Sequence, residues 1–129
     1  MKYLLDTQIF IWIDRDPDKM PAQIRDIISR NIDQIYISYA SIWEIEIKVK
    51  IGKLSFQSSI EIILQSQVST NLLKVLPITL EHIYGIKNLP VAHNDPFDRL
   101  IISQAIFEDM ILLSTDSIFD QYPVTVINT

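Results

Sequence analysis

The chain has 129 residues, a formal net charge of −5, no Cys, two Gly and two His. This length, with 48% hydrophobic residues, suits one buried core, so we expect a single domain spanning residues 1–129. The missing Cys excludes disulfides and thiolate zinc sites, and two glycines cannot build a glycine-rich phosphate loop or a nucleophile elbow.

Charge and hydropathy also bear on the partners and the compartment. Nucleic-acid-binding proteins are usually basic, so a charge of −5 at first argues against such a partner. The apolar first 13 residues are interrupted by Asp6 and Gln8 and lack a small-residue cleavage site, and no run reaches the roughly 18 apolar residues of a membrane helix. We therefore expect a cytoplasmic protein with no membrane partner.

Short apolar runs predict buried β-strands. They lie at residues 3–5, 35–37, 72–76 and 111–113, with a possible fifth at 124–126. The first four end at Asp6, Ser38, Pro77 and Ser114. Each run is short and apolar throughout, which is typical of a strand covered on both faces.

Helical patterns fill the segments between these strands. Apolar spacing predicts helices over residues 9–13, after Pro21, over 59–68 and after Asp95. Asp95 is a good N-cap, and Pro96 suits the first helical position.

The segment 43–51 is ambiguous. Its apolar residues 45, 47, 49 and 51 alternate with charged ones, which is a strand pattern. Ser38 and Ser41 can cap a helix, Ser41 and Glu44 have the spacing of a capping box, and Gly52 can end a helix. The residues favour a helix only slightly.

Strands that alternate with helices predict an α/β fold, a three-layer α/β/α sandwich around a parallel sheet. Such sheets bind ligands at the carboxyl ends of their strands. Asp6 and Asp116 follow the first and fourth strands, Glu44 follows the second, and Asp98 lies in the first turn of a covering helix. All four acids should converge on this edge, because covering helices begin where the strands end.

Clustered carboxylates repel one another, so they must take up protons in part or bind a cation. Oxygen ligands suit Mg²⁺ or Mn²⁺, and the matching chemistry is phosphoryl transfer or phosphodiester hydrolysis. Each acid also has an ordinary interpretation. Asp6 can cap a helix, and Glu44 can complete the capping box. Asp98 can be a first-turn acid favoured by the helix dipole, and Asp116 can lie in a turn.

Four segments, in order along the chain, resemble the motifs of the PIN domain family, and within it the VapC-like toxins of bacterial toxin–antitoxin pairs. The segments are Leu4-Leu5-Asp6-Thr7-Gln8, Ser38-Tyr39-Ala40-Ser41-Ile42-Trp43-Glu44, His93-Asn94-Asp95-Pro96-Phe97-Asp98-Arg99-Leu100 and Leu113-Ser114-Thr115-Asp116. The resemblance covers the whole chain. It implies an α/β/α fold with a mainly parallel five-stranded sheet, and a helix at 43–51.

The resemblance also implies a Mg²⁺- or Mn²⁺-dependent ribonuclease, with RNA as substrate, a small antitoxin as partner, and a homodimer. Asp6, Glu44, Asp98 and Asp116 match the family's catalytic, metal-holding acids. Asp98 is preferred to Asp95 as the ligand because Asp95 is needed as the N-cap, and Asp120 is expected to be exposed to solvent. Ser114 stands where the family usually has Thr.

Four further residues are candidates for supporting the acids or binding substrate. Lys48 lies one turn after Glu44 and can orient it or meet a phosphate, Arg99 can clamp a phosphate, and Thr7 and Ser114 can donate to carboxylates. Each can equally be an ordinary surface or capping residue. His93 is interpreted as a structural hydrogen-bonding residue.

Two other functions remain in competition. A PIN-like interaction module without activity would keep the fold, and an Asp-based phosphotransfer protein would place acids at the same strand ends. The second would expect Asp-x-Asp-x-Thr after the first strand, where this chain has Asp6 followed by Thr7 and Gln8. Without the four candidate ligands, twelve acids face eleven bases, or −1, so the acidity no longer argues against a nucleic-acid substrate.

Overall fold

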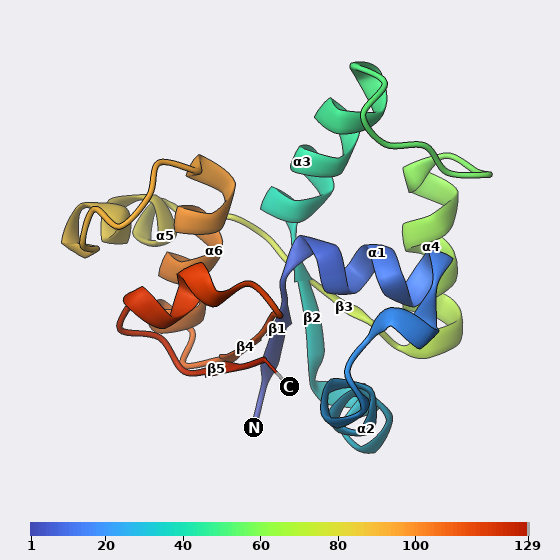
Figure 1. The fold of residues 1–129 in the computed structure, drawn as a ribbon, viewed down its shortest axis with the longest axis horizontal. Coiled ribbons are helices and arrows are strands. Elements are labelled where there is room, and N and C mark those ends of the chain that lie inside the picture. The colour runs from blue at the N-terminus through green and yellow to red at the C-terminus, as the bar shows by residue number, and fades with distance from the viewer. Residues whose placement is uncertain (129) are drawn as a thin grey trace.

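The computed structural model describes residues 1–128, and Thr129, the last residue of the expected domain, lies outside them. In this described part of the chain, five parallel strands form one sheet in the order β3-β2-β1-β4-β5, with helices on both faces (Figure 1). The strands are β1 (Tyr3–Leu5), β2 (Ile35–Ser38), β3 (Lys74–Leu76), β4 (Ile111–Leu113) and β5 (Val126–Ile127). The expected α/β/α fold with a parallel five-stranded sheet is confirmed.

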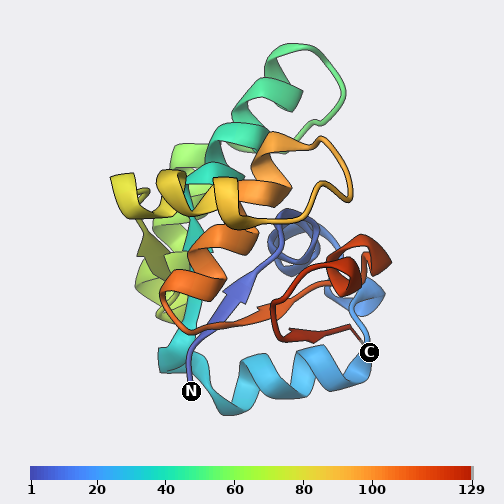
Figure 2. The same ribbon diagram turned by 90° about the vertical axis from the view of Figure 1, so that its left-hand side faces the viewer.

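Residues 1–128 contain six α-helices: α1 (Thr7–Arg15), α2 (Ala22–Arg30), α3 (Tyr39–Lys50), α4 (Ile60–Asn71), α5 (Leu80–Gly85) and α6 (Pro96–Phe107). Short 3₁₀ turns lie at η1 (Pro17–Lys19), η2 (Ile32–Gln34), η3 (Ile86–Asn88) and η4 (Ser117–Gln121). Helix α2 lies at the end of the sheet where the strands begin, and α3 extends past their carboxyl ends (Figures 1 and 2). No helix in the described range 1–128 is long and apolar enough to cross a membrane.

Two predicted strand boundaries were wrong. The third strand begins at Lys74, not at 72, because Leu72 ends α4 in the left-handed conformation, with φ at 59°. The fifth strand lies at Val126–Ile127, paired with Leu112 and Leu113, so the predicted run 124–126 was placed two residues early. Helix α5 was not expected.

The ambiguous segment 43–51 is helical up to Lys50 in α3, and Ile51 is the C-cap of this helix. Ser38 caps this helix by accepting a hydrogen bond from the N–H of Ala40, whereas Ser41 lies inside it, so the capping-box interpretation of Ser41 was wrong. Ile45 is fully buried, but Ile47 and Val49 remain partly exposed. The strand-like alternation therefore comes from apolar residues that the helix leaves at the surface.

The core has two halves, one on each face of the sheet. Ile9 and Phe10 of α1, Ile24 of α2 and Ile63 of α4 pack against the face that carries Leu5 and Leu113. Leu100, Ile101 and Ala105 of α6 pack with Phe119 against the face that carries Leu4 and Leu112. Neighbouring residues of β1 and β4 thus point to opposite faces, as the period of a strand requires.

The strand order places a switch point at β1. The chain proceeds from β1 to β2 and β3 on one side, and then crosses to β4 and β5 on the other. In open α/β sheets, ligands bind in the crevice outside the carboxyl ends of the strands at such a point. The residues that follow β1 and β4 therefore occupy the most favourable place for a site.

Candidate active site

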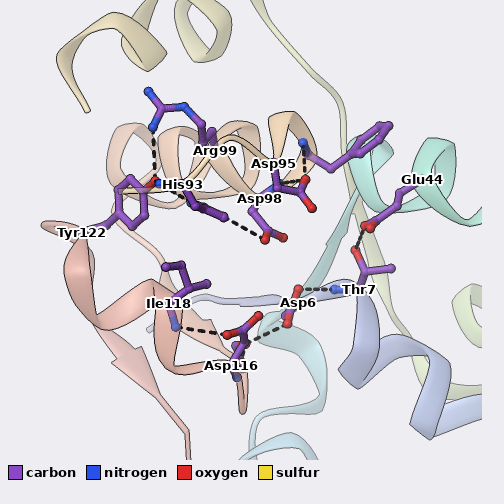
Figure 3. Close-up of polar contacts among 12 residues, drawn as sticks. Asp6, Thr7, Glu44, His93, Asp95, Asp98, Arg99, Asp116, Ile118 and Tyr122 are labelled. Atoms are coloured by element: carbon purple, nitrogen blue, oxygen red, sulfur yellow. Dashed lines mark hydrogen bonds and ion pairs between the residues drawn. The ribbon is translucent and has the colours of Figure 1, made fainter. Parts of the chain in front are cut away.

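The four predicted acids lie at this switch point. Asp6 directly follows β1, Asp116 lies three residues past β4, Glu44 is in α3 and Asp98 is in the first turn of α6. Figure 3 shows Asp6, Asp98 and Asp116 facing a common space, while the carboxylate of Glu44 is turned toward Thr7. The structure thus brings together acids that are up to 110 positions apart in the sequence.

Asp6 is fixed by residues that follow β1 and β4. It is 7% exposed, and its Oδ1 accepts the N–H of Thr7 at 2.8 Å. Its Oδ2 accepts the hydroxyl of Ser114 at 2.7 Å, and the Ser114 oxygen in turn accepts the N–H of Asp116 at 3.0 Å. Ser114 therefore ties the end of β4 to the carboxylate that ends β1.

Glu44 is held by a chain of hydroxyls and a lysine. Its Oε1 lies 2.8 Å from the Thr7 hydroxyl, and its Oε2 lies 3.0 Å from the Lys48 ammonium. The Thr7 oxygen is also 2.8 Å from the Ser41 hydroxyl. Because Thr7 has one hydrogen to donate, Ser41 must donate to Thr7, and Thr7 donates to Glu44. The orientation of this buried carboxylate is set from two sides.

The two acids at the start of α6 have different tasks. Asp95 is the N-cap, and its Oδ1 accepts the N–H groups of Phe97 at 2.9 Å and Asp98 at 3.1 Å. Asp98 is thereby free to face Asp6, and its Oδ2 lies 3.1 Å from Nε2 of His93. The expected capping role of Asp95 is confirmed.

Asp116 is exposed, unlike the other three acids. Its Oδ1 accepts the N–H of Ile118 at 3.1 Å, which makes it the N-cap of η4. Asp116 therefore both caps this turn, as its ordinary interpretation expected, and lies beside Asp6.

The site disfavours negative charge. Burial raises the pKa of Asp6 to about 7, the Ser114 hydrogen bond opposes this rise, and the negative charges of Asp98 and Glu44 add to it. Burial likewise raises the pKa of Asp98 to about 6, against the hydrogen bond from His93 and with the charges of Asp95 and Glu44. Asp6, Glu44 and Asp98 thus repel one another, and a cation placed among them would relieve that repulsion.

The donor set fits a hard divalent cation. Every candidate ligand offers oxygen alone, which suits Mg²⁺ or Mn²⁺ and not Zn²⁺. Across residues 1–128, no three His or acidic side chains are close enough to hold an ion as they stand. Mg²⁺ usually keeps several of its waters and takes only one or two carboxylates. The carboxylates that face the common space could meet such an ion together with its waters.

The supporting candidates divide into two groups. Thr7, Ser114 and Lys48 contact the acids, as described above. Arg99 does not: its Nη1 donates to the Pro90 carbonyl at 2.8 Å and to the Tyr122 hydroxyl at 3.2 Å. The sequence interpretation missed the part of Tyr122, because a side chain from beyond β4 reaches α6 only in the folded chain.

The PIN domain family matches residues 3–124 of the chain. The chain belongs to the PIN domain family. PIN domains are nucleases, so this membership supports a hydrolase that acts on phosphodiester bonds, and the family generally uses divalent metal ions. The family resemblance expected from the motifs is therefore confirmed.

Solved structures share this PIN fold along its whole length. VapBC2 from Rickettsia felis, bound to a promoter DNA fragment, has a TM-score of 0.75 at 19% identity, covering 99% of this chain and 98% of that one. DNA-bound VapBC from Salmonella typhimurium has a TM-score of 0.71 at 17% identity, covering 98% and 97%. VapBC-1 from nontypeable Haemophilus influenzae has a TM-score of 0.65 at 19% identity, covering 99% and 98%. No curated protein matches the chain.

Proposed function

We propose that this PIN domain, residues 1–129 as one unit, is a Mg²⁺- or Mn²⁺-dependent endoribonuclease. It would act in the cytoplasm as the toxin of a VapBC-like toxin–antitoxin pair. The observation that carries the proposal is the convergence of Asp6, Glu44, Asp98 and Asp116 at the switch point of the sheet.

Asp6, Asp98 and Asp116 would hold the ion, with Glu44 at the side of the site next to Thr7. The bound ion would polarise a phosphate oxygen and help to generate hydroxide from water at neutral pH. The chain's own residues prepare the site: Ser114 and Thr7 fix Asp6, and Ser41 and Lys48 act on Glu44 directly or through Thr7. The ammonium of Lys48, which is half exposed, is also within reach of a substrate phosphate beside Glu44.

Two features support the proposed protein partners. The similar structures are toxin–antitoxin complexes, which suggests an antitoxin for this chain too. Helix α3 and its C-cap residue leave a stripe of apolar side chains at least 38% exposed, at positions four residues apart: Tyr39, Trp43, Ile47 and Ile51. Such a stripe suits a protein contact, and we assign it to the proposed homodimer.

Cleavage of a labelled RNA, with Mg²⁺ or with chelator, tests the proposal. Asp98→Asn should abolish Mg²⁺-dependent cleavage, because it removes a charge that faces the proposed ion. Asp33→Asn is the matched control, since Asp33 is an exposed acid at the opposite end of β2. Full activity of Asp98→Asn, or equal cleavage in chelator, would contradict the assigned site.

Ion binding separates the enzyme from an inactive interaction module. Calorimetric titration of the wild-type protein with Mn²⁺ should give a saturable signal that Asp98→Asn weakens. A protein that binds no Mn²⁺ at millimolar concentration would instead favour the module.

A further inference from the structure

A row of hydrogen bonds connects Asp98 to His93, Tyr122 and Arg99. His93, in the loop before α6, places Nε2 3.1 Å from Oδ2 of Asp98. Its Nδ1 lies 2.6 Å from the hydroxyl of Tyr122, which also receives Arg99 Nη1 at 3.2 Å. Figure 3 shows these four residues in a row, ending at the carboxylate that faces Asp6.

Counting donors and acceptors assigns the hydrogen on the imidazole. The Tyr122 oxygen accepts two N–H groups, from Arg99 Nη1 and from the backbone N–H of His93 at 3.3 Å. Both lone pairs are then used, so the tyrosine must donate its own hydrogen, and Nδ1 of His93 is the acceptor. The imidazole hydrogen therefore stands on Nε2, where it donates to Asp98.

Tyr122 and Arg99, at the far end of this row of hydrogen bonds, are themselves held in place. Tyr122 is 5% exposed and belongs to the core on the α6 face of the sheet. Arg99 is fixed in turn by the carbonyl of Pro90. The buried ring of Tyr122 and the guanidinium of Arg99, which makes two hydrogen bonds, thus set the direction in which His93 presents Nε2–H.

We infer that His93 is a positioning residue, which orients the carboxylate of Asp98 for a divalent ion by donating from Nε2, with its tautomer imposed by Tyr122. This inference rests on the proposed function, because it takes Asp98 to be an ion ligand. Partners that orient a ligand commonly account for a 10- to 100-fold effect on metal affinity. The sequence interpretation of His93 as a purely structural residue would then be incomplete.

Two substitutions separate positioning from structure. His93→Asn places an amide near Nδ1, so it can still accept from Tyr122 but cannot donate to Asp98. His93→Gln places an amide N–H near Nε2, so it can still donate to Asp98. A merely structural role predicts that Asn is the better replacement, and a positioning role predicts Gln.

The readout is the dissociation constant for Mn²⁺ alone, measured by calorimetric titration without RNA. We expect His93→Asn to bind Mn²⁺ at least about 10-fold more weakly than the wild type, and His93→Gln to stay within about threefold. Glu108→Gln is the matched control: Glu108 accepts from the other histidine, His82, at 2.7 Å, and should leave Mn²⁺ binding unchanged.

The outcomes are distinguishable. Wild-type binding with equal binding by His93→Asn overturns the positioning role and leaves the proposed nuclease standing. No Mn²⁺ binding by the wild type overturns both. If His93→Asn does not fold, Tyr122→Phe replaces it, because the ring that fills the core remains; unchanged Mn²⁺ affinity there would equally refute the inference.

The tautomer can be checked on the metal-free protein. Two-bond ¹H–¹⁵N correlation spectra of the imidazoles should show the His93 hydrogen on Nε2, and the chain has one other histidine to assign. Tyr122→Phe should shift the Nδ1 resonance of His93. A hydrogen on Nδ1 in the wild type would refute the hydrogen-bond assignment.

Discussion

Asp6→Asn should stabilise the metal-free protein above neutral pH, because it removes a buried charge and keeps the shape of the side chain. Burial, above all, raises the pKa of Asp6 from 3.8 to about 7. Between these two pH values the folded protein holds a proton that the unfolded chain has lost. The free energy of unfolding then falls by about 1.4 kcal/mol per pH unit, or roughly 4 kcal/mol across the window.

The sign and the offset follow from the contacts. The stabilisation by the protonated carboxyl is complete below pH 3.8 and is lost as the pH rises through about 7. Asn keeps an oxygen for the N–H of Thr7 but cannot accept from Ser114, which costs about 1 kcal/mol. The net gain at pH 8 is about 3 kcal/mol, which corresponds to a Tm higher by roughly 10 °C in a domain of this size.

Thermal melting followed by circular dichroism, in chelator at pH 5 and pH 8, tests this value. The Tm of the wild type should fall further between the two pH values than that of Asp6→Asn. Asp33→Asn, which changes an exposed acid, should melt like the wild type. If Asp6→Asn is no more stable than the wild type at pH 8, the buried charge at Asp6 carries no penalty and the reasoning fails.

Three further substitutions have definite expected effects. Thr7→Val removes the hydroxyl between Ser41 and Glu44 and leaves a buried carboxylate oxygen without its donor. The free energy of unfolding, measured by urea denaturation, should fall by about 1–3 kcal/mol, and an unchanged midpoint would contradict this. Lys48→Met removes an ion pair whose lysine is half exposed, so stability should change by less than about 1 kcal/mol, while the KM for RNA rises if Lys48 meets a phosphate. Leu72→Gly removes the strain of a side chain in the left-handed conformation, at φ 59°, and should stabilise the fold by about 1 kcal/mol, measured by thermal melting.

The positions of Asp6 and Asp116 were predictable because both residues follow the ends of predicted strands. A short apolar run followed by Asp6, and another followed by Ser114 and Asp116, fixes the edge of a parallel sheet where both runs end. The N-cap position of Asp95 also follows from local sequence, since Pro96 suits the first helical position. Local sequence was sufficient to predict a position wherever a single strand end or helix start determines it.

The partners of the acids were not predictable in the same way. Ser41 was interpreted as a helix cap, but Ser38 takes that position and leaves Ser41 free to donate to Thr7. The connection of His93 to Tyr122 joins two loops that are 29 residues apart. Neither contact has a spacing signal, because each depends on how α3 and η4 pack in three dimensions.

The four acids bear their charge by different means, and this difference explains how an acidic site can persist without an ion. Asp116 is exposed to solvent, and Glu44 has Lys48 as a counter-charge. Asp6 and Asp98 rely on hydrogen-bond donors: Thr7 and Ser114 donate to Asp6, and His93 donates to Asp98. Burial raises the pKa of both carboxyls. The ion-free site therefore holds protons on these two residues at a higher pH than an exposed carboxyl does. A divalent ion would have to displace those protons, so its affinity should rise with pH through the range of about 6 to 7.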